Sequence, residues 1–190
     1  MKKLLVATVK PFHPNAVEGI KDICNKAGYE FNLLEKYNDQ AELIEAVKDV
    51  NALIIRSDKV TKEVIDAAEN LEIVVRGGAG YDNVDLEAAT AKNVVVMNTP
   101  GQNSNAVAEL ALGMMVFLAR NKFNGKAGTE LRGKKLGIHA FGNVGSYVAQ
   151  IAKGFGMEVY AYDPFVDDDV IKKAGISPID TVDKLYETCQ

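Results

Sequence analysis

The stretch KKLGIHAFGNVG, residues 134–145, decides the fold of the second half of this chain. Its first six residues predict a short buried strand, and apolar side chains at helical spacing follow residue 145, so a tight turn joins a strand to a helix. The segment from Glu158 to Tyr162 predicts a second strand, which ends in Asp163. An acidic residue about 20 positions beyond such a turn is expected to accept hydrogen bonds from the ribose hydroxyls of a dinucleotide.

The turn AFGNVG, residues 140–145, is similar to the glycine-rich pattern that places a pyrophosphate against the free amides of a helix N-terminus. Ala140 stands where the first glycine is expected, and alanine is compatible with this turn only if its φ angle stays negative. An ordinary strand-to-helix turn, and a turn role for Asp163 before Pro164, remain alternatives. No arginine follows Asp163, so a 2′-phosphate would be repelled and NAD is favoured over NADP. The residues that this pattern assigns to the cofactor are Gly142, Gly145 and Asp163.

The first hundred residues alternate short apolar runs with segments of helical spacing. Apolar strands between amphipathic helices imply a parallel sheet that is covered on both faces, so we expect an α/β fold. The predicted strands are residues 4–9, 31–34, 52–55, 73–75 and 94–97. The predicted helices are residues 15–27, 41–50, 61–68 and 85–91.

A polar connector at residues 98–105 leads to an apolar helix at residues 107–119 and a glycine-containing linker at 121–133. The helix is too short to span a bilayer, which needs about 20 residues. A helix that is apolar all round must be buried, so we place it between two domains or at a dimer interface. We therefore expect one domain at residues 1–100 and a second at 101–190. The second domain has room for only about half of a six-stranded nucleotide-binding sheet.

The 190-residue chain is 47% apolar and 25% charged, as is typical of a globular protein. Its net charge of −4 argues against a nucleic-acid or anionic-membrane surface, which needs clustered lysine and arginine. Cys24 and Cys189 match no metal spacing, so no metal site is predicted and a reducing compartment is expected. The N-terminal apolar run is too short for a secretory signal, and the cytoplasm is the expected location.

A second constellation follows the fourth predicted strand in the sequence RGGAGYDN, residues 76–83. Three glycines within residues 77–80 leave backbone amides uncovered, and consecutive amides form an anion-binding nest. Arg56 and Ser57 end the third strand, at the same carboxyl edge where ligands bind in such sheets. The two segments predict a site for a small, doubly anionic molecule, with a glycine-rich turn and a surface arginine as the alternative.

Taken together, these segments resemble the D-2-hydroxyacid dehydrogenases, and most closely the D-3-phosphoglycerate dehydrogenases among them. The resemblance covers essentially the whole chain and is most specific over residues 74–120, VVRGGAGYDNVDLEAAT followed by VVVMNTPGQNSNAVAELALGMMVFLAR. It implies a flavodoxin-like substrate-binding domain followed by an incomplete Rossmann NAD-binding domain. It also implies that the helix at residues 103–121 lies at the hinge and at a homodimer interface.

The resemblance assigns roles to individual residues. Arg56, Ser57 and Asn103 would contact the phosphate end of the substrate. The backbone of Gly78, Ala79 and Gly80 would hold its carboxylate, and Ala79 would also lie near the nicotinamide. Asn143 and Val144 would join Asp163 in holding the dinucleotide.

Three departures from the family pattern limit what is expected of the chain. Ala140 replaces a family glycine, and the linker at 121–133 is shorter than usual and lacks the family's tryptophan. The family's catalytic arginine, its carboxylate partner and its histidine general acid/base have no counterpart among these residues. His139 is expected to be a packed strand residue, and His13 either a substrate-edge contact or a turn residue. No catalytic residue is therefore predicted, and this chain alone is expected to give negligible turnover.

The expected function is NAD-dependent oxidation of a D-2-hydroxy acid, most of all 3-phosphoglycerate to 3-phosphohydroxypyruvate, the step that opens serine biosynthesis. The expected partners are this small phosphorylated hydroxy acid and a second copy of the chain, but neither nucleic acid nor membrane. One alternative is a non-catalytic, NAD-binding scaffold similar to a corepressor, which would have no evident use for Arg56 and Ser57. Another is a proteolytic remnant whose apolar sheet edge invites aggregation.

Overall fold

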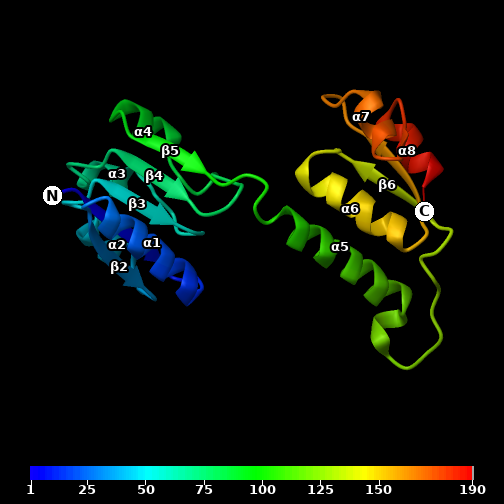
Figure 1. The fold of residues 1–190 in the computed structure, drawn as a ribbon, viewed down its shortest axis with the longest axis horizontal. Coiled ribbons are helices and arrows are strands. Elements are labelled where there is room, and N and C mark those ends of the chain that lie inside the picture. The colour runs from blue at the N-terminus through cyan, green and yellow to red at the C-terminus, as the bar shows by residue number, and fades with distance from the viewer. Residues whose placement is uncertain (190) are drawn as a thin grey trace. The chain divides into compact units, whose positions relative to one another are not determined.

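The computed structural model describes residues 1–189 and divides the chain into two compact units (Figure 1). The first unit is Met1–Pro100 and the second begins at Gly101. Each unit contains a parallel sheet with helices packed against it, which confirms the predicted α/β fold.

The sheet of the first unit has five parallel strands in the order β2-β1-β3-β4-β5. This is the flavodoxin-like order, as expected, and it brings the carboxyl ends of all five strands to one edge. The strands are β1 Lys3–Thr8, β2 Glu30–Glu35, β3 Ala52–Ile55, β4 Ile73–Arg76 and β5 Val95–Asn98. The helices are α1 Pro14–Lys26, α2 Gln40–Ala46, α3 Lys62–Ala67 and α4 Leu86–Ala91.

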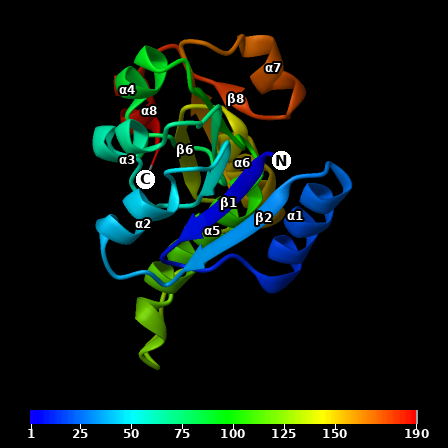
Figure 2. The ribbon, with the colours of Figure 1, turned by 90° about the vertical axis from the view of Figure 1, so that its left-hand side faces the viewer.

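The core of the first unit lies on the sheet face that α2, α3 and α4 cover, whereas α1 lies on the opposite face (Figure 2). Alternate strand residues point to this core because side chains along a strand alternate between its two faces. Leu43 of α2, Leu53 of β3 and Ile65 of α3 are completely buried there. Each such side chain contributes about 1.5–3 kcal/mol of burial free energy, so the apolar pattern seen in the sequence is what holds the layers together.

The second unit contains three parallel strands in the order β6-β7-β8. This arrangement matches the first half of a doubly wound nucleotide-binding sheet, in which the first strand lies beside the second and the second beside the third. Helix α5 packs along α6, and Ala108, Leu112, Ala149 and Ala152 are buried in the core that these helices share with the strands. The elements are α5 Ser104–Ala119, a 3₁₀ turn at Asn121–Phe123, β6 Lys135–His139, α6 Asn143–Gly154, β7 Glu158–Tyr162, α7 Asp168–Lys173, β8 Ser177–Pro178 and α8 Val182–Thr188.

The structure corrects three details of the sequence analysis. Helix α5 begins at Ser104, three residues before the start that the apolar pattern predicted and one residue after the start that the family resemblance implied. The polar residues that suggested a loop form its first turn. Strand β8 and helix α8 were not predicted, since β8 is two residues long and ends in a proline. Strands this short carry no readable alternation of apolar and polar residues.

Helix α5 buries one face and exposes another within this chain. Its sequence, apolar over residues 107–119 except for Glu109 and Gly113, predicted burial between two domains or at a dimer interface. Its fully buried residues are Ser104, Ala108 and Leu112, whereas Leu110 is 64% exposed. The other large side chains that α5 exposes are Val107, Met114, Phe117 and Leu118.

Within residues 1–189, no helix is both long enough and apolar enough to cross a membrane.

Candidate functional site

The turn between β6 and α6 presents unused backbone amides at a helix N-terminus. Gly142 is the N-cap of α6 and provides no side chain to cap it. The first helical bond joins the amide of Ser146 to the carbonyl of Gly142 at 3.0 Å. Among the described residues, the amides of Asn143, Val144 and Gly145 make no hydrogen bond. These amides and the positive end of the helix dipole can bind an anion such as a pyrophosphate.

Asp163 lies directly beside this turn. Its Oδ2 atom accepts a hydrogen bond from the amide of Phe141 at 2.8 Å. Its Oδ1 atom accepts one from the amide of Phe165 at 2.9 Å, so the carboxylate also shapes the turn before Phe165. Each carboxylate oxygen has a further lone pair, so Asp163 can hold the turn and still accept two ribose hydroxyls.

Gly145 allows α6 to approach β6 closely. A Cβ atom at this position would lie 2.2 Å from the carbonyl oxygen of Ala140 and 3.1 Å from Cγ2 of Ile138. The first of these atoms belongs to the backbone and cannot move aside, so only glycine fits here. Gly142, in contrast, has open space around its Cα. Asn143 lies across from Gly101, where an added Cβ would be 3.5 Å from its Nδ2 atom.

Ala140 contradicts the expectation that its φ angle stays negative, because the structure places it at +88°. Its amide donates to the carbonyl of Tyr162 at 2.8 Å, and its own carbonyl faces Gly145. These constraints from β7 and α6 impose the left-handed conformation, which costs a non-glycine residue on the order of 1 kcal/mol or more. The turn therefore has the glycine-type conformation although its first residue is alanine.

We expect Ala140→Gly to raise the free energy of unfolding by about 1 kcal/mol, because glycine adopts a positive φ without steric cost. Urea denaturation followed by circular dichroism measures the change. Ala149→Gly, at a buried position inside α6, should instead lower stability by about 1 kcal/mol or more. Equal losses in the two variants would show that Ala140 is not strained.

The carboxyl edge of the first unit carries two guanidinium groups where the sequence predicted one. Arg56, after β3, donates from Nη1 to the carbonyl of Pro11 at 3.3 Å. Arg76, the last residue of β4, donates from Nε to the carbonyl of Arg56 at 2.9 Å. The Arg76 side chain lies over Gly78, where an added Cβ would collide with Nη1. Arg76, and not Arg56, is therefore the cation next to the glycine loop, and its place directly before the glycines is the signal that could have identified it.

The glycine loop offers fewer free amides than the predicted nest. The amide of Gly77 donates to the carbonyl of Ile55, and the amide of Gly78 donates to the carbonyl of Arg76, both at 2.8 Å. The loop is fastened further because Nδ2 of Asn98 donates to the carbonyl of Ala79 at 2.7 Å. Within residues 77–80, which the structure describes in full, the amides of Ala79 and Gly80 make no hydrogen bond. The amide contribution to an anion site thus comes from Ala79 and Gly80, while Gly78 contributes space for Arg76.

The remaining predicted residues lie in local structural roles. Ser57 is exposed beside Arg56, and Asn103 is the exposed N-cap of α5. His13 caps α1, with Nδ1 accepting a hydrogen bond from the amide of Asn15 at 3.3 Å. His139 was expected to be a packed strand residue, but it is exposed at the end of β6, where its ring lies 5.8 and 6.4 Å from those of Tyr162 and Tyr186.

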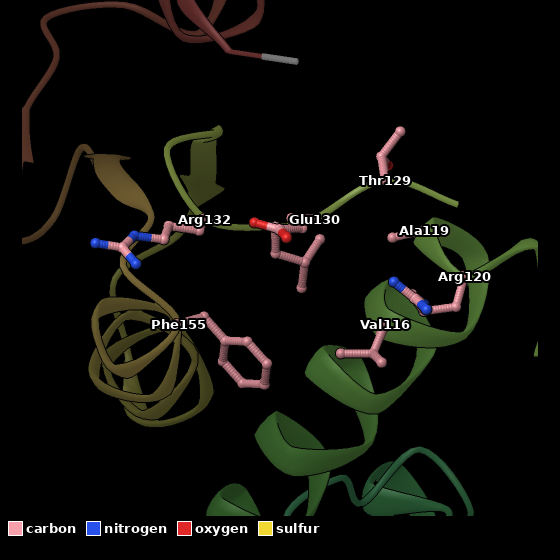
Figure 3. Close-up of a pocket in the computed structure, with 8 residues that line it drawn as sticks. Val116, Ala119, Arg120, Thr129, Glu130, Arg132 and Phe155 are labelled. Carbon is pink, nitrogen blue, oxygen red and sulfur yellow. The ribbon is translucent and has the colours of Figure 1, made fainter. Parts of the chain in front are cut away.

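A cavity of about 230 Å³ lies between the C-terminal end of α5, residues 129–132 and the end of α6 (Figure 3). The ring of Phe155 and the guanidinium of Arg120 point toward it, whereas Arg132 points away. None of the predicted site residues lines this cavity. Each unit therefore has its own candidate site in the loops at its strand ends, and this cavity is not one of them.

Comparisons with known proteins agree with this geometry. Residues 5–161 match the family model for the D-isomer specific 2-hydroxyacid dehydrogenase, catalytic domain. The chain is 36% identical to D-3-phosphoglycerate dehydrogenase of Methanocaldococcus jannaschii, over 97% of this chain and 36% of that protein. It is 41% identical to hydroxypyruvate reductase of Thermotoga maritima, over 71% of this chain and 49% of that protein.

Among solved structures, the NAD⁺-bound 3-phosphoglycerate dehydrogenase of Entamoeba histolytica is similar, with a TM-score of 0.90 and 46% identity. The match covers 99% of this chain and 60% of that one, so the chain spans only part of the length of its relatives. The family match covers most of the chain, and relatives above 30% identity cover more than two thirds of it. The chain therefore belongs to the D-isomer specific 2-hydroxyacid dehydrogenase family.

Proposed function

We propose that this protein binds NAD at the β6–α6 turn and a phosphorylated D-2-hydroxy acid at the edge of the first sheet. The corresponding reaction is oxidation of 3-phosphoglycerate at C2, with transfer of the hydride to the nicotinamide. The observation that carries the proposal is the placement of Asp163 against a turn whose helix begins with three unbonded amides. The amides suit a pyrophosphate, and the carboxylate suits the ribose that follows it.

The choice of NAD over NADP rests on charge. The Asp163 carboxylate would lie against the ribose hydroxyls, where a 2′-phosphate would bring a second negative charge. The next residues, Pro164 and Phe165, provide no cation to compensate. The name of the NAD⁺-bound relative from Entamoeba histolytica points the same way.

The choice of a phosphorylated substrate rests on the two arginines of the first unit. The named relatives include enzymes for phosphorylated and for unphosphorylated acids, so family membership alone does not decide between them. The Arg76 side chain donates to the backbone carbonyl of Arg56, and the Arg56 guanidinium donates to the carbonyl of Pro11, so the loops at this sheet edge carry two positive charges. Two guanidinium groups suit a ligand that carries both a phosphate and a carboxylate better than a simple hydroxy acid.

Calorimetric titration of the purified chain with 3-phosphoglycerate, and separately with D-glycerate, tests the ligand class. We expect saturable binding of 3-phosphoglycerate and an affinity for D-glycerate that is weaker by about tenfold or more, because charged hydrogen bonds to the phosphate are lost. Equal affinities, or no binding of 3-phosphoglycerate, would contradict the proposal.

We also propose that this chain binds its ligands without turning them over. Oxidation of an alcohol requires a base for the hydroxyl proton, and histidine is the usual one. Nδ1 of His13 caps α1, and His139 is an exposed residue at the end of β6 whose ring lies beside those of Tyr162 and Tyr186. Rapid NAD⁺ reduction with 3-phosphoglycerate by the purified chain would overturn this part of the proposal.

The exposed face of α5 leads us to propose a homodimer. Leu110, Met114 and Leu118 recur at intervals of four residues and form one apolar stripe on the helix. Exposed apolar stripes of this kind mark association surfaces, and homo-oligomers most often use a two-fold axis. Sedimentation velocity should show a dimer, and a monomer at all accessible concentrations would contradict the proposal.

A further inference from the structure

Asp58 is a buried carboxylate next to the proposed phosphate-binding residues Arg56 and Ser57. Its exposed fraction is 7%, although it follows two exposed residues on the same loop. Burial of a charged group costs free energy unless hydrogen-bond donors surround it. The hydrogen bonds that Asp58 accepts therefore indicate the structural role of its carboxylate.

Both carboxylate oxygens of Asp58 accept hydrogen bonds from neighbouring loops. Oδ1 accepts from the amide of Val9 at 2.7 Å and from the hydroxyl of Tyr37 at 2.9 Å. Oδ2 accepts from the amide of Arg56 at 3.3 Å. Burial and the hydrogen bond to Asp58 raise the pKa of Tyr37 far above its usual value, so the phenol stays protonated and remains a donor.

The backbone of Asp58 joins the same network. Its carbonyl accepts a hydrogen bond from Nδ2 of Asn83 at 2.7 Å. Val9 follows β1, Tyr37 follows β2, Asp58 follows β3, and Asn83 follows β4. One residue therefore connects the loops at the carboxyl ends of four neighbouring strands, which is the edge where ligands bind in sheets of this kind.

The peptide groups of Arg56 are held from both sides as a result. Its amide donates to Asp58, and its carbonyl accepts from Nε of Arg76 at 2.9 Å. Its guanidinium is steadied by the carbonyl of Pro11. A side chain that is fixed before the ligand arrives loses less conformational entropy on binding, which raises affinity without a new contact.

We propose that Asp58 is a positioning residue for the phosphate end of the substrate, and this inference rests on the proposed function. It orients Arg56 through the backbone and does not touch the ligand. An exposed carboxylate at this position would repel a bound phosphate. The carboxylate of Asp58 is buried, and its oxygens accept three hydrogen bonds that offset the negative charge. Tyr37 completes the arrangement, because its hydroxyl supplies one of those donors.

Asp58→Asn tests the proposal because the change is selective. The amide oxygen of asparagine can still accept hydrogen bonds from Val9 and Tyr37. Its NH₂ group, however, then faces the backbone N–H of Arg56, and because both groups are donors, that hydrogen bond is lost. We expect the affinity for 3-phosphoglycerate to fall by about tenfold or more, with the affinity for NADH unchanged. Tyr37→Phe should give a smaller loss of affinity in the same direction.

Asp85→Asn is the matched control. Asp85 caps α4 and its Oδ1 accepts from the amide of Ala88 at 2.9 Å, so the same chemical change is made at a carboxylate away from Arg56, and the asparagine oxygen can still accept this bond. Because asparagine caps helices about as well as aspartate, thermal stability and 3-phosphoglycerate affinity should both stay close to those of the wild type. An Asp58→Asn protein that binds 3-phosphoglycerate like the wild type would overturn the proposal, as would equal losses of affinity in the two variants.

Amide hydrogen exchange separates this inference from the proposed function. If the wild-type chain does not bind 3-phosphoglycerate, the proposed ligand is wrong, and the exchange rate of the Arg56 amide still decides whether Asp58 holds it. We expect that rate to rise by about tenfold in Asp58→Asn and to stay unchanged in Asp85→Asn. No change at Arg56 would overturn the positioning role. If Asp58→Asn fails to fold, the Tyr37→Phe protein decides: lower affinity for 3-phosphoglycerate supports the proposal, and unchanged affinity overturns it.

Discussion

Replacing Gly145 by alanine is expected to lower the free energy of unfolding by about 1–3 kcal/mol and to remove saturable binding of NADH. Alanine is a better helix former than glycine by about 1 kcal/mol, which favours the variant. The added Cβ, however, would lie 2.2 Å from the carbonyl oxygen of Ala140, well inside van der Waals contact. Because that oxygen belongs to the turn itself, relief of the clash must displace the amides that are proposed to hold the pyrophosphate.

Gly154→Ala is the control for Gly145→Ala. Gly154 is in the same helix and has open space around its Cα, so an alanine there should leave stability unchanged or raise it by up to about 1 kcal/mol. Urea denaturation and NADH titration of both variants separate helix propensity from the clash. A Gly145→Ala protein with wild-type stability and NADH affinity would show that the close approach of α6 to β6 is not needed.

The second large effect is expected for Arg56→Gln, which should weaken 3-phosphoglycerate binding by about 2–3 kcal/mol, or about 30- to 150-fold. The guanidinium provides a planar set of donors that glutamine cannot reproduce, and its charge is lost as well. Stability should change little, because the side chain is exposed and, among residues 1–189, makes a single hydrogen bond, to Pro11. Calorimetric titration of 3-phosphoglycerate measures the effect.

Lys59→Gln is the matched control for Arg56→Gln. Lys59 is an exposed cation on the same loop, so its replacement changes the net charge equally. We expect less than a threefold loss of affinity, because an exposed charge outside the site acts only through a screened field. Equal losses in the two variants would attribute the effect to overall charge and would remove the specific role of Arg56.

Much of the fold could be predicted from the residues themselves. The apolar runs gave the five strands of the first sheet and both long strands of the second to within two residues at each end. Their periodicity is strong because each strand or helix buries a full face. The strand order 2-1-3-4-5 came from the family resemblance, since periodicity alone does not specify which strands are neighbours.

The details of the site were harder to predict because they depend on contacts between distant segments. The positive φ of Ala140 follows from β7 and α6 holding the turn, which local preference does not reveal. Arg76 could have been noticed from its place before the glycines, but its contact with Arg56 joins residues 20 positions apart. Asp58 reads as an ordinary loop residue in the sequence, and only the packing of four loops shows that it is buried.

The central claim is that the β6–α6 turn and Asp163 together bind NAD. Fluorescence titration of the purified chain with NADH and with NADPH tests this claim most directly. We predict saturable binding of NADH and an affinity for NADPH that is weaker by about tenfold or more, because Asp163 repels the 2′-phosphate. The absence of saturable NADH binding, or equal or tighter binding of NADPH, would contradict the account.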